Sequence, residues 1–114
     1  MIQAKRVYEA PAAKDGYRVL IDRLWPRGLS KASAKVDLWL KDAAVSDELR
    51  RWYGHDPARW PEFRKRFLSE LKKKPAALSM IKKLEAEHGT VTLLFGAKDA
   101  RRSNATVLLG LLNK

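Results

Sequence analysis

The sequence contains no cysteine. This absence excludes disulfide bonds, zinc–thiolate sites and thiol nucleophiles, and it is compatible with the cytoplasm. Long apolar runs are also missing, because "TVTLLFGA" and "ATVLLGLL" are far shorter than the roughly 20 residues that span a bilayer. The N-terminal stretch "MIQAKRVYEA" lacks the apolar segment of a signal peptide. We therefore expect a cytoplasmic protein that has no membrane partner.

Several motifs of catalytic and nucleotide-binding proteins are absent as well. The sequence has no G-x-x-x-x-G-K-[ST] phosphate loop, no G-x-G-x-x-G after a strand and no G-x-S-x-G nucleophile elbow. Its two histidines, His55 and His88, are far apart in the chain and make a poor metal-binding set without cysteine. We therefore predict no metal site and no cofactor.

A strong basic bias is what the sequence does have. Its 24 lysines and arginines outnumber 13 aspartates and glutamates, which gives a net charge of +11. A field of this sign attracts phosphates, nucleotides or nucleic acid, although it is also compatible with a basic surface that is merely solvated. The length of 114 residues and the apolar fraction of 46% predict one domain over 1–114.

The apolar residues follow strand-like and helix-like patterns in turn. Strands are predicted over 3–9, 17–25 and 90–99, and the last two contain continuous apolar runs typical of strands that are covered on both faces. Segment 36–42 fits either a strand or one helical turn. Helices are predicted over 46–54, from the apolar stripe that starts at Trp60 to Lys74–Pro75, from there to His88–Gly89, and over 103–114.

This order of elements predicts a small α/β fold of three-layer-like form. It would have a largely parallel sheet of 3–4 strands and a helical middle region. The alternative is an α+β fold with antiparallel N-terminal strands. Trp39, Trp52 and Trp60 occupy helical or alternating apolar positions, so we expect them in the core.

The two most apolar strands are followed by the same kind of charge. Asp22 and Arg23 follow "VLI", and Lys98 and Asp99 follow "LLF". If these strands are parallel neighbours, the four side chains meet at the sheet edge where α/β proteins bind ligands, beside the N-terminus of the last helix. Arg23 or Arg27 would then clamp a phosphate or carboxylate, with Lys98 as a point charge. In the alternative, each aspartate only neutralises the cation next to it.

Two further groups near these strand ends have two interpretations each. Trp25 either caps the sheet or stacks on a base or sugar. His55 is either a general base oriented by Asp56 or an exposed loop residue. The weak catalytic candidates are therefore Asp22, His55, Asp56 and Asp99, and the candidates for anion binding are Arg23, Trp25, Arg27, Lys31, Lys98, Arg102 and Asn104.

Three stretches taken together resemble one protein family. They are "DGYRVLIDRLWPRGLSK", "WLKDAAVSDELRRWYGHDPARWPEFRKRFLSEL" and "VTLLFGAKDARRSNATVL". They resemble the domain of unknown function 488, in its short YeaO-like branch, over nearly the whole chain. The resemblance implies a small bacterial cytoplasmic α/β protein and no established reaction. The positions that match its motifs are Asp22, Arg23, Trp25, Arg27, Lys31, His55, Asp56, Lys98, Asp99 and Asn104.

The chain departs from this family at positions where chemistry would matter. Longer relatives carry a cysteine-containing segment where this chain has Phe95 and Gly96. Members of the short branch often have a histidine near Arg102, which is a cation here. These departures favour the binding of an anion over the cleavage of a bond.

Our leading hypothesis is a protein that binds a phosphorylated or otherwise anionic small molecule at the strand-end crevice. The first alternative is a nucleic-acid-binding protein, which requires the cations of 61–88 and 98–102 to form one stripe. The second is a non-catalytic accessory protein that acts through a partner, with a homodimer left open.

Overall fold

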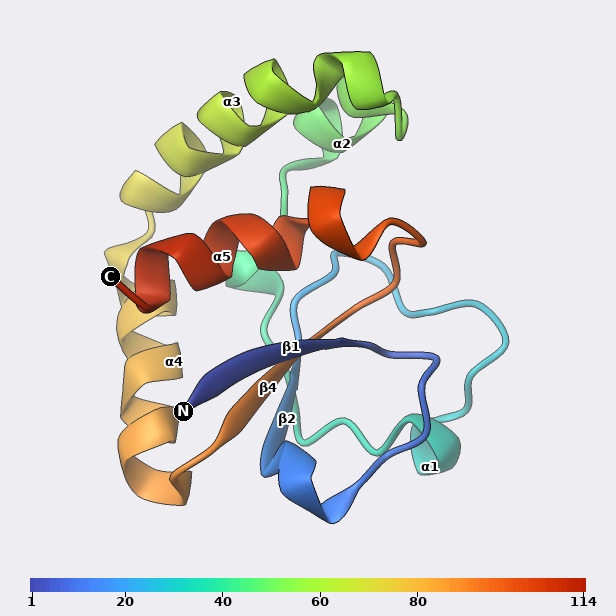
Figure 1. Cartoon of the computed structure of the whole chain (residues 1–114), viewed down its shortest axis with the longest axis vertical. Helices are drawn as coiled ribbons and strands as arrows, with labels where there is room; N and C mark the ends of the chain where they lie inside the picture. The colour runs from blue at the N-terminus through green and yellow to red at the C-terminus, as the bar shows by residue number, and fades with distance from the viewer.

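The computed structural model describes residues 1–114 and is drawn in Figure 1. The strands are β1 (Ile2–Arg6), β2 (Tyr17–Leu20), β3 (Leu38–Trp39) and β4 (Val91–Phe95). The α-helices are α1 (Lys31–Ala34), α2 (Asp47–Tyr53), α3 (Trp60–Lys72), α4 (Pro75–His88) and α5 (Asn104–Leu112). Short 3₁₀ helices are η1 (Ala13–Asp15), η2 (Lys41–Ala43), η3 (Pro57–Arg59) and η4 (Ala100–Arg102).

The four strands form one sheet in the order β1-β4-β2-β3. Every neighbouring pair is parallel, so the predicted α/β fold with a parallel sheet is confirmed and the antiparallel alternative is wrong. Strand β4 lies between β1 and β2, and all five of its residues are buried, as its continuous apolar run predicts. The two most apolar strands are therefore direct parallel neighbours, as the expected site requires.

Alternation along the strands gives the sheet two apolar faces. Val19 and Leu93 point to the larger core, where helices α2 to α5 pack. Leu20 and Leu94 point to a smaller core on the other face, which is covered by the irregular segment 22–37 with its single-turn helix α1. One outer layer of the expected three-layer arrangement is thus made of loop rather than helix.

The predicted strands are too long, because strand-forming residues continue past the strand ends, as Val7 and Ile21 do. Strand β1 ends at Arg6, β2 ends at Leu20, and segment 36–42 contributes only the two residues of β3. The predicted helix break at Lys74–Pro75 is confirmed, since α4 starts at Pro75.

The three tryptophans expected in the core lie at its edges. Trp52 and Trp60 pack against the larger core and Trp39 against the smaller one, and all three are half-buried. The two ends of the chain lie close together, since the Asn113 side-chain amide donates to the Ile2 carbonyl at 3.3 Å (Figure 1). No helix has the length and apolar character required to cross a membrane.

Candidate functional site

The carboxyl ends of β1, β4 and β2 meet at one edge of the sheet. The register pairs Leu20 with Leu94 and Arg6 with Phe95, so the residues that follow each strand emerge side by side. Those residues are Tyr8 after β1, Asp22 after β2 and Gly96 after β4. Helix α5 begins at the same edge, because the Asn104 amide reaches the Ile21 carbonyl at 3.2 Å. The local sequence pattern of a buried run followed by charge therefore builds this edge.

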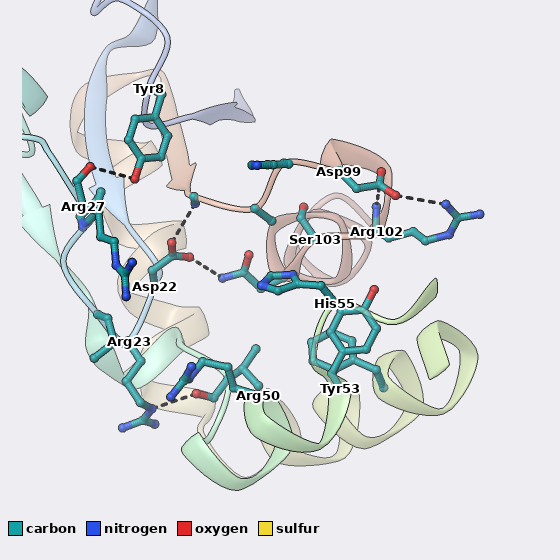
Figure 2. Close-up of a pocket in the computed structure, with 18 of the residues that line it drawn as sticks. Tyr8, Asp22, Arg23, Arg27, Arg50, Tyr53, His55, Asp99, Arg102 and Ser103 are labelled. Atoms are coloured by element: carbon teal, nitrogen blue, oxygen red, sulfur yellow. Dashed lines mark hydrogen bonds and ion pairs between the residues drawn. The ribbon is translucent and has the colours of Figure 1, made fainter. Parts of the chain in front are cut away.

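Asp22 lies at the centre of the edge (Figure 2). One carboxylate oxygen accepts from the Gly96 amide at 2.8 Å, and the other accepts from the Asn104 side chain at 3.0 Å. Burial raises the pKa of Asp22, and these two hydrogen bonds and the nearby His55 offset the shift only in part. No ion pair compensates the carboxylate, since none of those in the structure includes Asp22. The result is a partly buried acid that keeps unused acceptor capacity.

Three cations that line the same cavity as Asp22 form no ion pair. Arg23, Arg27 and Lys98 belong to no ion pair in the structure. Arg23 donates from Nε to the Val45 carbonyl at 2.9 Å, which orients the guanidinium and leaves its four other N–H groups available. The loop that carries Arg27 is held by Tyr8, whose hydroxyl donates to the Arg27 carbonyl at 3.1 Å. The sequence alternative, in which each aspartate neutralises the adjacent cation, does not occur.

Asp99 and Arg102 form the start of the last helical segment. Asp99 accepts from the amides of Arg101 and Arg102, which makes it the N-cap of η4, and its side chain pairs with Arg102 at 3.1 Å. The hydrogen bond from Arg102 lowers the pKa of Asp99. Ser103 is buried and caps α5 by accepting from the Thr106 amide. Asp99 is therefore engaged by its own loop and is poorly prepared to act as a base.

The opposite wall comes from the end of α2 and the start of α3. Tyr53 stacks on Phe63 with ring centroids 4.3 Å apart, and both rings are largely buried. Burial and the nearby Asp99 raise the pKa of Tyr53. His55 is exposed, faces Asp22 in Figure 2 and has a φ of +57°, which is unusual for a residue other than glycine.

These walls enclose a cavity of about 840 Å³. Its size suits a small-molecule ligand. Five cationic side chains line it against two carboxylates, together with aromatic and apolar groups. The lining residues are Tyr8, Asp22, Arg23, Leu24, Trp25, Pro26, Arg27, Val45, Arg50, Tyr53, His55, Pro57, Phe63, Gly96, Ala97, Lys98, Asp99, Arg102, Ser103 and Asn104.

Most of the site residues expected from the sequence line this cavity, and two do not. Lys31 starts α1 and lies outside the lining. Asp56 also lies outside it, because its carboxylate caps η3 by accepting from the Ala58 amide and makes no hydrogen bond to His55. The expected orientation of His55 by Asp56 is therefore absent.

Two of the lining residues have different roles from those expected. Asn104 holds Asp22 through its side-chain amide, so that donor is already engaged within the protein. Trp25 donates from its indole to the Leu29 carbonyl at 2.7 Å and packs edge-on against Trp39, which gives it a structural role at the rim.

Sequence reasoning missed Tyr8, Arg50, Tyr53 and Ser103. The strand predicted over 3–9 includes Tyr8, whereas β1 ends at Arg6. The sequence therefore did not indicate that Tyr8 follows the strand and lies at the sheet edge. Arg50 and Tyr53 read as ordinary residues of helix α2, and nothing local indicates that this helix covers the strand ends. No group of three or more His, Asp or Glu side chains is placed to hold a metal ion.

Comparisons with known proteins place the chain among uncharacterised relatives. Residues 1–114 match the family described as "Inactive DUF488-N3 subclade". Uncharacterized proteins of Mycobacterium tuberculosis and Mycobacterium bovis are each 44% identical over 112 residues, which is 98% of this chain and 93% of theirs. The uncharacterized protein YeaO of Escherichia coli is 37% identical over 107 residues, 94% of this chain and 92% of its own. No solved structure matches.

Proposed function

The chain belongs to the DUF488 family and matches its inactive DUF488-N3 subclade over its whole length, and we propose that it binds a phosphorylated or otherwise anionic small molecule in the strand-end cavity. The observation that carries this proposal is the set of three cations, Arg23, Arg27 and Lys98, that line the cavity and form no ion pair. Cations that are grouped around one concave site repel one another, and an anion relieves that repulsion.

The proposed function is binding rather than turnover. The family description contains the word inactive, which favours a site that does not turn a substrate over. In this chain Asp99 is paired with Arg102 and Asp56 lies outside the cavity. Only Asp22 and His55 remain as acid–base groups beside the cations. We further propose a cytoplasmic location, with which the absence of cysteine is compatible.

Isothermal titration of inorganic phosphate, pyrophosphate and citrate into the protein tests this function. We expect at least one anion to bind, and Arg23→Ala to weaken it about tenfold or more, since a charge-assisted hydrogen bond contributes about 1.5–3 kcal/mol. Arg64→Ala is the matched control, because Arg64 is exposed, has no ion pair and lies outside the cavity. No binding, or an equal loss in both variants, would contradict the proposal.

A second candidate function is nucleic-acid binding on the outer face of α2 and α3. The observation that favours it is a half-buried tryptophan beside two arginines: the guanidinium carbons of Arg66 and Arg59 lie 4.4 Å and 5.3 Å from the Trp52 ring centroid. Arginine and tryptophan together are suited to a phosphate backbone and unstacked bases. Binding of a fluorescent single-stranded oligonucleotide should then fall steeply with salt and should weaken in Arg59→Ala/Arg66→Ala but not in Arg23→Ala. Weak, salt-insensitive binding would count against it.

A further inference from the structure

The Asp22 carboxylate has acceptor capacity that the protein does not use. An ionised carboxylate offers about four lone-pair positions, and the Gly96 amide and the Asn104 side chain occupy one on each oxygen. Each oxygen can therefore accept one more hydrogen bond, and Asp22 lines the same cavity as the free cations. A buried acceptor without a cation is costly unless a donor completes it.

We propose that the ligand is a phosphorylated sugar or polyol whose neighbouring hydroxyl groups donate to Asp22 while cations of the cavity lining hold its phosphate. This inference rests on the proposed function, because it identifies the other end of the same anionic ligand. The two oxygens of one carboxylate are spaced to receive two adjacent donors, as a vicinal diol supplies.

The charge of the cavity selects a neutral donor over a positive one. Five cations and two carboxylates line it, so an ammonium group on the ligand would meet net repulsion from the same wall that attracts the phosphate. A hydroxyl donates to Asp22 without that cost. Hydroxyl groups therefore fit the site better than amines.

The lining beside Asp22 suits the ring of a sugar. Tyr8, an exposed aromatic residue, lines the cavity on the side of β1. Aromatic faces pack against the C–H groups of a sugar ring while its hydroxyls turn to a polar partner. A ring with phosphate at one end and a diol at the other therefore matches the three kinds of group that meet here.

Two probes that share a ring and a phosphate test the inference. They are 1,4-anhydroribitol 5-phosphate, which has the vicinal diol, and tetrahydrofurfuryl phosphate, which lacks both hydroxyls. In calorimetric titrations we expect the parent protein to bind the diol more than about tenfold more tightly, since two hydrogen bonds to a carboxylate are gained. In Asp22→Asn the two affinities should differ by less than about threefold, whereas Glu48→Gln, an exposed carboxylate outside the cavity, should keep the parent ratio.

Equal affinity of the parent for the two probes overturns the diol assignment while the anion site stands. If neither probe nor inorganic phosphate binds the parent, the proposed function fails and this inference with it. A diol preference that persists in folded Asp22→Asn also overturns the role of Asp22. The comparison of probes on the parent decides the question even if the variant does not fold.

Discussion

Asp22 is the residue on which the strand-end site depends, and it carries a cost in the free protein. Its carboxylate is held by Gly96 and Asn104, yet burial still raises its pKa. Gly96 allows this close approach, because a Cβ at that position would stand 3.0 Å from the Asp22 oxygen. An acidic group that is disfavoured as an ion and lines a cavity with cations that it does not pair with is better explained by a ligand than by stability.

The raised pKa of Asp22 gives a pH dependence of defined sign. Folding favours the protonated form, so the contribution of Asp22 to stability is full below its unfolded pKa, about 3.9, and is lost as the pH rises through the folded pKa. The free energy of unfolding of the parent minus that of Asp22→Asn should therefore decrease as the pH rises above about 3.9. Urea titrations followed by tryptophan fluorescence measure it, and a difference that is flat or increasing would contradict the assignment.

At the other end of the sheet, the pKa shift of Asp15 gives a pH dependence of stability of the opposite sign. It pairs with Arg18 at 2.5 Å and with Lys5 at 3.1 Å, and its exposed fraction is 1%. Burial raises its pKa, but hydrogen bonds from the Ala12 amide, Lys5 and Arg18 outweigh that effect and lower it. Its stabilisation is therefore present above the unfolded pKa and is lost as the pH falls through the folded pKa.

Removal of the Asp15 charge should be strongly destabilising. The substitution Asp15→Asn leaves Arg18 buried without its counter-charge, which costs about 3 kcal/mol in buried pairs. Asp47→Asn is the matched control, since Asp47 pairs with Arg50 and Arg51 at the surface. Removal of its charge should change the free energy of unfolding by only about 0–1 kcal/mol. Chemical unfolding at pH 7 provides the comparison, and a similar effect of the two substitutions would refute it.

At the scale of elements, the link between α2 and α3 stores strain beside the cavity. Gly54, the C-cap of α2, has a φ of +53°, and the next residue, His55, has a φ of +57°. Glycine adopts this region freely, whereas a side chain there costs about 1–2 kcal/mol. The strain persists at a residue that lines the cavity, as expected where a side chain is positioned for function.

Two substitutions at His55 separate the backbone from the ring. Both His55→Gly and His55→Ala remove the imidazole, but only glycine relieves the positive φ. We expect His55→Gly to be more stable than His55→Ala by about 1 kcal/mol. Thermal unfolding of the two variants measures this difference, and an equal or more stable alanine variant would show that the turn has relaxed.

Some elements of the site follow from local sequence and others do not. The order of elements predicted a largely parallel sheet, and on the condition that β2 and β4 are parallel neighbours their apolar runs followed by charge placed Asp22, Arg23 and Lys98 at one edge, where they line the same cavity. The wall from α2 could not be predicted, because its position over the strand ends depends on long-range packing of Tyr53 and Phe63.

The roles of individual residues were harder to predict than their location. Asn104 was expected to bind a ligand and instead holds Asp22, since an amide can reach either and sequence gives no distance. Arg18 gave no sign of a partner, because its buried pair with Asp15 forms through the fold of the turn before β2. The sequence pattern therefore predicts which side chains lie at the sheet edge, whereas the hydrogen bonds and ion pairs among them depend on distances that the sequence does not give.

At the scale of the whole molecule, the net charge of +11 is a stability term of its own. The molecule measures 36 × 31 × 20 Å, so at about 0.01 M salt, where the Debye length is about 30 Å, most of its charges repel one another. At about 0.15 M the length is about 8 Å and this repulsion is largely screened. Exposed ion pairs weaken as well, but each contributes only about 0–1 kcal/mol.

We therefore expect sodium chloride to stabilise the protein. Between about 10 and 150 mM salt the unfolding temperature should rise, because screening removes more repulsion among 24 cations than attraction within the exposed pairs. Lys83→Glu, at an exposed position of α4 outside the cavity, lowers the net charge by two and should reduce this rise. The charge-neutral change Ser79→Ala on the same helix should leave it unaltered. A fall in the unfolding temperature with salt would mean that attraction within local ion pairs outweighs the repulsion due to the net charge. The basic surface would then be a network of ion pairs and not an excess of positive charge suited to an anionic partner.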